Sequence, residues 1–319
     1  MIDLDIIVVG ELNVDLVFTG VTSLPEMGKE KIVKDMNFTM GSASAIFASN
    51  IAKLGMKVGF IGKLGNDEFG EFMLQSLKER NVDVSHIVKD DGLKTGITVS
   101  LSFPDNYAMV TYPGAMDDLS IRDIDFDYVR GAKHLFLSSY YLQPGMKKGC
   151  SELFKRAKEN GLTTSFDPGW DPSENWDREA IFRVLQHVDV FLPNEQEALN
   201  ITGVNDVESA LDMLNEKVET VVIKKGSRGS IAKKGDKLIK ADVFKVKVID
   251  TTGAGDSFNA GYLYKYLKGG SIKDSLIFGS ACGGIATTKL GGTTASPTLE
   301  EVEEFLEERT REVEGAISY

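Results

Sequence analysis

The sequence is poor in cysteine and contains no long apolar run. Its 319 residues include two cysteines, Cys150 and Cys282, which lie far apart in the chain. This number excludes a scaffold held together by disulfides, and the spacing does not suit a structural zinc site. No apolar run approaches the roughly 18 residues of a membrane-spanning helix, and residues 1–5 lack the basic segment that opens a secretory leader. We therefore expect no membrane partner and a cytoplasmic location.

Clusters of basic residues are also lacking. The chain has 36 Lys and Arg against 48 Asp and Glu, which gives a formal net charge of -12. Contacts to nucleic-acid phosphates need clustered Lys and Arg, so a nucleic-acid partner is not expected. The charge does not exclude ATP or another small anion, because backbone dipoles and a metal ion can bind phosphates on an acidic protein.

Two common nucleotide-binding motifs are missing as well. The first apolar run ends at Gly10, and Glu11, Leu12 and Asn13 follow where a dinucleotide-binding oxidoreductase needs G-x-G-x-x-G. The chain also has no G-x-x-x-x-G-K-S/T, the phosphate loop of Walker-type ATPases. Both enzyme classes are therefore disfavoured.

What the chain does have is a regular alternation of strand and helix patterns. Short apolar, β-branched runs predict buried strands at 5–10, 58–62, 135–138, 163–167, 188–192 and 220–224. Amphipathic stretches predict helices at 44–54, 70–80, 147–160, 178–186, 195–202 and 207–217. This order predicts an α/β fold with a mostly parallel sheet covered by helices on both faces. No linker divides the chain, so we expect one domain over residues 1–319.

Two segments, at about 12–40 and 94–113, interrupt this alternation. Residues 98–103 and 107–112 alternate in hydrophobicity around Pro104, Asp105 and Asn106, which predicts a hairpin. We interpret both segments as a small β-sheet lid over the main sheet, and an extension of the main sheet's edge is the alternative. Exposed lid strands could also pair between two chains and form a homodimer.

The most informative segment for chemistry is Asp250-Thr251-Thr252-Gly253-Ala254-Gly255-Asp256, which leads into a helical pattern. Glycines at a helix start let backbone N–H groups approach an anion, and the helix dipole adds positive charge there. Gly253, Ala254 and Gly255 therefore form a candidate anion site. Asp256 beside it is suited to take a proton from an attacking hydroxyl in phosphoryl transfer. A capped helix with tight glycine packing is the plainer interpretation.

This segment, continued through Ser257-Phe258-Asn259-Ala260-Gly261, matches the C-terminal signature of the ribokinase-like (PfkB) carbohydrate kinases, and the chain resembles that family along nearly its whole length. The resemblance implies a three-layer αβα fold and transfer of the γ-phosphate of ATP to a hydroxyl of a small sugar. It implies that Asp256 is the catalytic base and that the amides of Gly253, Ala254 and Gly255 neutralise the transferred phosphate.

The resemblance also implies substrate contacts near the N-terminus. Asn13 and Asp15 match the family residues that bind sugar hydroxyls, although alone they would be read as turn residues. The next signature departs from the family, because Ser42 follows Gly41 in place of a second glycine and Ile46 stands where an asparagine is usual. Ile46 cannot donate a hydrogen bond, so Gln143 or Tyr140 is a candidate for the missing contact.

Further matches concern ATP and metal ions. Asn194 and Glu197 match an Asn-x-x-Glu motif, in which Glu197 would organise Mg²⁺ through water and Asn194 would lie near the ATP phosphates, although Asn194 alone would be read as a helix cap. Lys224, Gly226, Ser227 and Gly229 match a nucleotide loop that could also be a plain β-turn, and residues 279–286 with 291–292 match the adenine side. A monovalent cation, K⁺, would be held by the family's further loop, here Asp250, Thr252, Ala286, Lys289, Gly291 and Ala295.

The substrate remains open among three alternatives. No pair of arginines is placed to bind a sugar acid or a sugar phosphate, which favours a neutral sugar such as fructose or ribose, although Lys29, Lys31 and Lys34 keep a phosphorylated substrate open. Ile46 and Phe47 could instead line the pocket of a nucleoside kinase. A catalytically silent sugar-binding protein is the third alternative, which the intact Asp256 disfavours.

Overall fold

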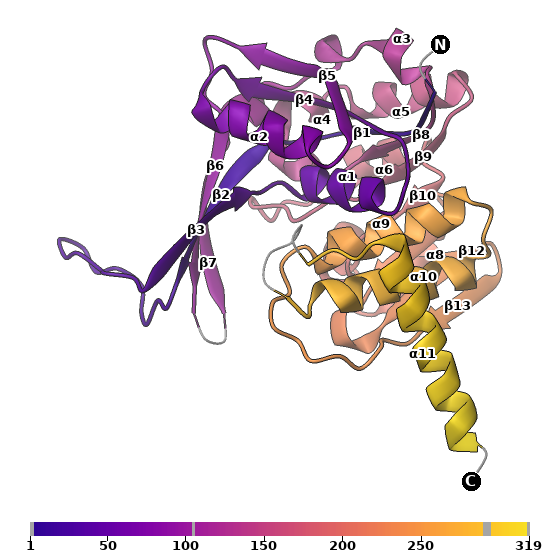
Figure 1. Cartoon of the computed structure of the whole chain (residues 1–319). Helices are drawn as coiled ribbons and strands as arrows, with labels where there is room; N and C mark the ends of the chain where they lie inside the picture. The colour runs from indigo at the N-terminus through magenta and orange to yellow at the C-terminus, as the bar shows by residue number, and fades with distance from the viewer. Residues whose placement is uncertain (1–2, 104–105, 290–294, 318–319) are drawn as a thin grey trace.

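The computed structural model describes residues 3–103, 106–289 and 295–317, with side chains through Arg309. Within these ranges the main sheet has nine strands in the order β13-β12-β11-β10-β9-β8-β1-β4-β5 (Figure 1). Every neighbouring pair from β5 to β11 is parallel, whereas β11/β12 and β12/β13 are antiparallel. The strands are β1 (Leu4–Val9), β4 (Val58–Gly65), β5 (Val82–Asp90), β8 (Ala132–Leu137), β9 (Thr163–Phe166), β10 (Val190–Phe191), β11 (Thr220–Lys224), β12 (Ser230–Lys234) and β13 (Lys237–Ala241).

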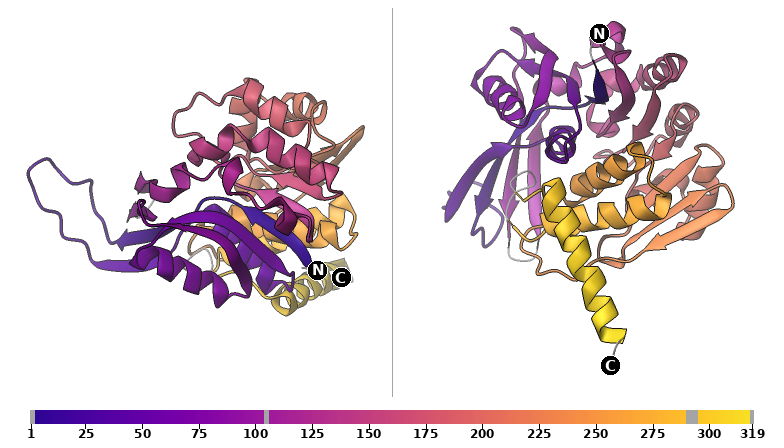
Figure 2. Two further views of the ribbon diagram at one scale, coloured as in Figure 1. Left: turned by 90° about the horizontal axis from the view of Figure 1, so that it is seen from above. Right: turned by 45° about the vertical axis from the view of Figure 1, so that its right-hand side comes forward.

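Helices cover both faces of this sheet, which confirms the predicted three-layer fold (Figure 2). The central strand β1 shows the arrangement, because Ile6 and Val8 pack in one core while Ile7 and Val9 pack in the other. The first core includes α1 (Ala43–Lys53), α2 (Glu68–Lys78), α9 (Ala254–Leu267), α10 (Ile272–Ala286) and the start of α11 (Leu299–Ile317). The second includes α3 (Phe126–Val129), α4 (Pro144–Lys147), α5 (Cys150–Glu159), α6 (Arg178–Leu185), α7 (Glu195–Thr202) and α8 (Val207–Asn215).

A separate small sheet projects from the main body (Figure 1). Its order is β3-β2-β6-β7, formed by β2 (Asn13–Thr19), β3 (Asp35–Met40), β6 (Gly96–Ser102) and β7 (Tyr107–Tyr112). The pairing of β6 with β7 is antiparallel, which confirms the predicted hairpin, although Pro104 and Asp105 lie outside the described residues. The alternative of an extended main-sheet edge is therefore wrong.

The two faces of the small sheet differ in chemistry. One row of paired residues, Thr39-Asp15-Thr98-Thr111, crosses all four strands, and the next row, Phe38-Leu16-Val99-Val110, points to the opposite face. Phe38 packs on Phe72 of α2 with ring centroids 4.4 Å apart. The polar face therefore carries Asp15, and the apolar face contacts the main body through α2.

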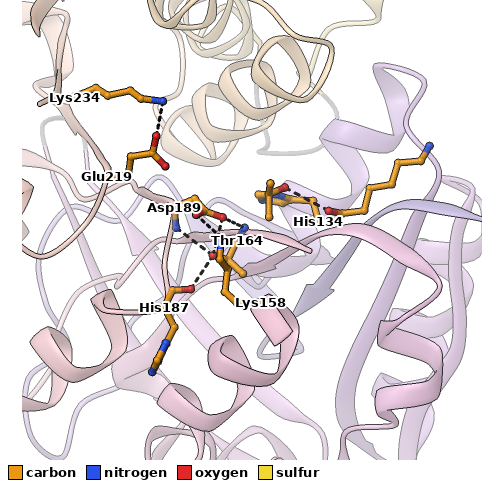
Figure 3. Close-up of polar contacts among 9 residues, drawn as sticks. His134, Lys158, Thr164, His187, Asp189, Glu219 and Lys234 are labelled. Atoms are coloured by element: carbon orange, nitrogen blue, oxygen red, sulfur yellow. Dashed lines mark hydrogen bonds and ion pairs between the residues drawn. The ribbon is translucent and has the colours of Figure 1, made fainter. Parts of the chain in front are cut away.

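The amino ends of the central strands hold a polar cluster that serves the fold (Figure 3). Asp189 accepts from the amide of Thr164 at 2.8 Å and from the ammonium of Lys158 at 2.6 Å. His134 is fully buried between the hydroxyls of Thr163 (2.7 Å) and Ser165 (2.6 Å). In the described parts of the chain, no helix combines the length and the apolar character needed to cross a bilayer.

Candidate active site

The segment singled out for catalysis forms the start of α9. Gly253 adopts φ 71°, a left-handed conformation that favours glycine, and the helix begins at Ala254. The amide of Ala254 donates to the carbonyl of Thr251 at 3.2 Å, so this N–H closes the turn. The amides of Gly255 and Asp256 have no protein partner among the described residues, and a Cβ added to Gly255 would meet nothing within 4 Å. Open backbone donors thus remain beside Asp256, as an anion site requires.

Asp256 occupies the first turn of α9 and is partly buried. Burial and the neighbouring carboxylate of Asp167 raise the pKa of Asp256 to about 8, and Lys224 acts in the opposite direction. A carboxyl group with a pKa near neutrality is a suitable general base, because it can accept a proton in one step and release it in the next.

Lys224, at the end of β11, is tied into this region by two side chains. Its Nζ lies 2.6 Å from Oδ2 of Asp167 and 3.2 Å from Oδ1 of Asn259. Asn259 in turn donates from Nδ2 to Oδ2 of Asp167 at 2.5 Å. The Lys224 ammonium therefore lies inside a closed triad in the structure, and its predicted contact with ATP stays a prediction.

The predicted Asn-x-x-Glu motif forms the N-terminal cap of α7. Asn194 Oδ1 accepts from the amide of Glu197 at 2.9 Å, and Glu197 Oε2 accepts from the amide of Asn194 at 2.8 Å. Glu197 is buried, and burial together with Asp167 raises the pKa of its carboxyl to about 7. No cluster of three or more His, Cys, Asp and Glu side chains suited to a metal ion occurs in the described residues. A Mg²⁺ ion that keeps several waters needs only one or two protein carboxylates, and the role of Glu197 beside such an ion stays a prediction.

The predicted substrate residues lie together where β2 leaves the main body. Asn13 Nδ2 donates to Oδ1 of Asp15 at 2.8 Å and to Oγ1 of Thr98 at 3.2 Å. A Cβ on Gly41 would lie 2.1 Å from Oδ1 of Asp15 and 2.6 Å from Nδ2 of Asn13, so the glycine backbone fits directly against both side chains. Burial raises the pKa of Asp15 to about 6, Asn13 counteracts this, and Glu11 adds to it. These groups can bind sugar hydroxyls as paired donors and acceptors.

Ser42 caps α1. Its Oγ accepts from the amide of Ala45 at 2.9 Å and donates to the carbonyl of Glu11 at 2.6 Å. The residue has φ 69°, in the left-handed region that a glycine would adopt without strain. The serine hydroxyl therefore serves the backbone in this structure, and a sugar contact by Ser42 stays a prediction.

The substitute contacts considered for Ile46 prove to be buried. Gln143 is fully buried and donates from Nε2 to the carbonyls of Ser138 (2.7 Å) and Ser139 (3.2 Å). Tyr140 is likewise enclosed, at 2% exposure, and Ile46 is 6% exposed. In this structure Gln143 supports the turn after β8, so its role as a sugar ligand stays a prediction.

The nucleotide loop follows β11 as a short turn, η4 (Gly226–Arg228). Gly226 and Gly229 have φ of 56° and 81°, and a Cβ on Gly229 would meet the carbonyl of Ala241 at 2.2 Å. Ser227 is exposed between them. Residues 279–286 lie in α10, where Gly279 packs against Phe258 of α9, so the small residues there also serve helix packing.

The predicted cation loop is described in part. The amides of Ile249 and Asp250 donate to the carbonyl of Thr287 at 2.8 and 3.2 Å, which joins the 250 segment to the end of α10. Ala286 and Ala295 are buried, Lys289 is exposed, and Thr252 donates its amide to Asp250 Oδ1 at 2.9 Å. Gly291 lies outside the described residues, as does Gly292.

Sequence reasoning missed several residues of the site. Asp167 and Asn259 complete the triad with Lys224, Thr98 bonds Asn13, and Glu11 is a buried carboxyl that binds Ser44. Asp167 ends a predicted strand, and Asn259 lies one helical turn beyond Asp256, so the sequence could have indicated that both lie near the predicted site. Thr98 gave none, because its position depends on the pairing of β6 with β2.

Comparisons with known proteins identify the family to which the chain belongs. The sequence profile of the pfkB family of carbohydrate kinases matches residues 3–299. An uncharacterized sugar kinase of Archaeoglobus fulgidus is 32% identical over 250 residues, which cover 77% of this chain and 98% of the relative. The 5-dehydro-2-deoxygluconokinase of Geobacillus thermodenitrificans is 30% identical over 325 residues, 95% of this chain and 93% of the relative.

Solved structures are similar over nearly the whole chain. The ribokinase of Thermotoga maritima has a TM-score of 0.84 at 27% identity, and the nucleoside kinase of Methanocaldococcus jannaschii has 0.82 at 25%. These alignments cover 95% and 96% of this chain and 99% of each structure. A putative ribokinase II of E. coli, solved with ATP and Mg²⁺, shares the fold at a TM-score of 0.86 and 24% identity. The chain therefore belongs to the pfkB family of carbohydrate kinases and is a phosphotransferase that acts on an alcohol group.

Proposed function

We propose that this kinase transfers the γ-phosphate of ATP to a hydroxyl of a small neutral sugar, with Asp256 as the base. The observation that carries the proposal is the placement of the Asp256 carboxyl beside the open amides of Gly255 and Asp256 at the start of α9. Asp256 takes the proton of the sugar hydroxyl, whose oxygen bonds to the γ-phosphorus while the bond from that phosphorus to the bridging oxygen of ADP breaks.

The nucleotide side has groups that suit ATP. The amide of Gly255, with open space around its Cα, fits a phosphate oxygen, and the turn from Gly226 to Gly229 brings backbone close to the same edge of the sheet. Glu197, held in the cap of α7, would orient waters of a Mg²⁺ ion, and Asn194 would lie near the phosphates. Mg²⁺ supplies neutralisation of the phosphate charge when bound with ATP.

A neutral substrate is supported by the charges around Asp15. Glu11 and Asp15 are carboxyl groups of the sugar side, Asp256 adds a third, and the Lys224 ammonium is already paired with Asp167. The ionised forms of these groups would repel a sugar acid or a sugar phosphate. Fructose and ribose are the leading candidates.

A nucleoside is the second candidate, because a nucleoside kinase is among the similar structures. Phe47, which could have lined a nucleoside pocket, instead stacks on Phe136 in the core with centroids 3.8 Å apart. A panel that measures ATP consumption with D-fructose, D-ribose, 5-dehydro-2-deoxygluconate and adenosine discriminates these substrates. Turnover of adenosine far above every sugar would contradict the proposal.

Asp256→Asn tests the base directly. The amide keeps the shape of the carboxyl but cannot accept the proton, so we expect turnover to fall by about 10³-fold or more while ATP binding stays within a few-fold of wild type. Binding is measured by calorimetry with ATP and Mg²⁺. Unchanged turnover would refute the assignment of Asp256 as the base.

We also propose that the small sheet, inserted from segments at about 12–40 and 94–113 of a single domain, closes as a lid over the bound sugar. Its apolar face exposes Val110 to 72%, Tyr112 to 50%, Met36 to 49% and Phe38 to 39%, which supports pairing of two lids in a homodimer. A strictly monomeric species in analytical ultracentrifugation at working concentration would contradict the dimer.

A K⁺ site remains part of the proposal. The amides of Ile249 and Asp250 both bond to the carbonyl of Thr287, so two of the segments that would supply ligands to the cation lie side by side. Its ligands would be Asp250, Thr252, Ala286, Lys289, Gly291 and Ala295, several of them through carbonyl oxygens. Turnover that is identical in Na⁺-only and K⁺ buffers would argue against this site.

A further inference from the structure

Three carboxyl groups from different elements of the fold act electrostatically on Asp256. Glu11 follows β1, Asp167 follows β9 and Glu197 lies in the first turn of α7, and each of them raises the pKa of Asp256. Lys224, at the end of β11, is the cation that acts on Asp256 in the opposite direction. An ionised base in such surroundings needs a compensating positive charge, because burial and like charges both favour its protonated form.

Lys224 is held in one position rather than free to move. Its side chain is 14% exposed, and the Asp167 side chain that it contacts at 2.6 Å is 8% exposed. Asn259 bridges the two, since its Oδ1 accepts from Lys224 and its Nδ2 donates to Asp167. Asn259 itself is fully buried and lies one turn after Asp256 in α9, so the bridge connects the strand ends to the helix that carries the base.

We propose that Lys224 is a counter-cation, fixed by Asp167 and Asn259, that favours the ionised form of Asp256, which is the form that accepts the hydroxyl proton. Lys224 is thus a positioning residue that acts through Asp256 rather than a ligand of the sugar. The inference rests on the proposed role of Asp256 as base.

The pH dependence of kcat/KM tests this inference, measured from pH 5.5 to 9.5 with saturating ATP and Mg²⁺. The acceptor is whichever of D-ribose and D-fructose the wild type turns over faster. In the wild type, kcat/KM should fall about tenfold per pH unit below the pKa of the base. In Lys224→Met we expect this acid limb to move up by about one pH unit or more, which lowers kcat/KM at pH 7 by a further tenfold.

Asp167→Asn should move the acid limb in the opposite direction, because it removes a carboxylate and leaves the cation. The double variant Lys224→Met with Asp167→Asn removes both charges and should return the limb toward the wild-type position, within about half a pH unit. Lys233→Met, on the neighbouring strand β12 and paired with Asp212 at the surface, removes the same charge and should leave the limb unchanged.

An acid limb that stays in place in Lys224→Met, with kcat reduced equally at all pH values, would overturn the inference in favour of a purely structural triad. If Lys224→Met fails to fold by circular dichroism, Asp167→Asn decides, and a limb that does not move to lower pH overturns the inference. If Asp256 is not the base, the Asp256→Asn variant retains its turnover. This result distinguishes a failure of the proposed function from a failure of the inference about Lys224.

Discussion

Gly41 offers a sharp test of where the sugar binds. In Gly41→Ala the new Cβ would lie 2.1 Å from Oδ1 and 2.5 Å from Cγ of Asp15, and 2.6 Å from Nδ2 of Asn13. Unstrained contacts between such atoms need about 3.5 Å, so both side chains must move by roughly 1 Å. The φ of Gly41 is outside the left-handed region, so the alanine backbone itself is not strained.

We expect this displacement to reduce kcat/KM for the sugar by about 10²-fold, because a 1 Å misplacement of positioning groups has effects of that order. The KM for ATP should stay within twofold, since Gly255 and Asp256 lie on α9 and are not touched by the new methyl group. Initial rates with the sugar and ATP varied in turn separate the two constants.

The matched control is Gly284→Ala in α10, where an added Cβ meets nothing within 4 Å. Alanine should stabilise that helix by up to about 1 kcal/mol and leave the KM for the sugar unchanged. A Gly41→Ala enzyme with wild-type kinetics for the sugar would refute the assignment of Asn13 and Asp15 to the substrate.

Two further predictions concern stability. Ser42→Ala removes the cap of α1 and keeps the left-handed φ of 69°, so we expect a loss of about 1–2 kcal/mol in the free energy of unfolding from urea titrations. Ser42→Gly should cost less, because it removes the backbone strain along with the cap. A larger loss in the glycine variant would contradict this reasoning. Burial lowers the pKa of His134 from 6.5 to about 3, so below pH 6.5 the imidazole binds a proton in the unfolded chain but not in the folded chain. His134 should therefore destabilise the fold progressively below pH 6.5, by at most about 2 kcal/mol at pH 5. In His134→Gln, the unfolding free energy should therefore decrease less between pH 7 and pH 5 than it does in the wild type. An equal decrease in the two proteins would show that His134 does not titrate in this way.

Much of the main sheet was accessible from the sequence, because buried parallel strands give continuous apolar runs and the helices between them are amphipathic. The strands predicted at 58–62 and 220–224 correspond to β4 and β11. The edge strands β5 and β13 were missed, since their residues are partly exposed and their patterns are weak. The strand predicted at 188–192 is reduced to Val190–Phe191, although the amides of Asp189 and Leu192 still bond to the carbonyls of Thr164 and Phe166 in β9.

Residue type alone did not show which protein groups some side chains contact. Gln143, in the turns after β8, and Lys224, at the end of β11, were predicted to contact ligands, and in the structure each also bonds to protein groups. Such partners come from other elements of the fold, and no local sequence pattern predicts them. Phe47 shows the reverse case, since its helix position fits either a pocket or a core, and packing on Phe136 decides for the core.

The sequence by itself determined the alternation of strands and helices, the glycine turn at residue 253 and the carboxyl group that follows it, because these depend on neighbours within one helical turn or one strand. Tertiary structure decided what surrounds that carboxyl group. Asp167 lies 57 residues from Lys224 and 92 from Asn259, and they meet because the strand order brings β9 and β11 to either side of β10 beneath α9. Strand order is set by the packing of the whole sheet, so charge compensation at Asp256 could be read only from the folded chain.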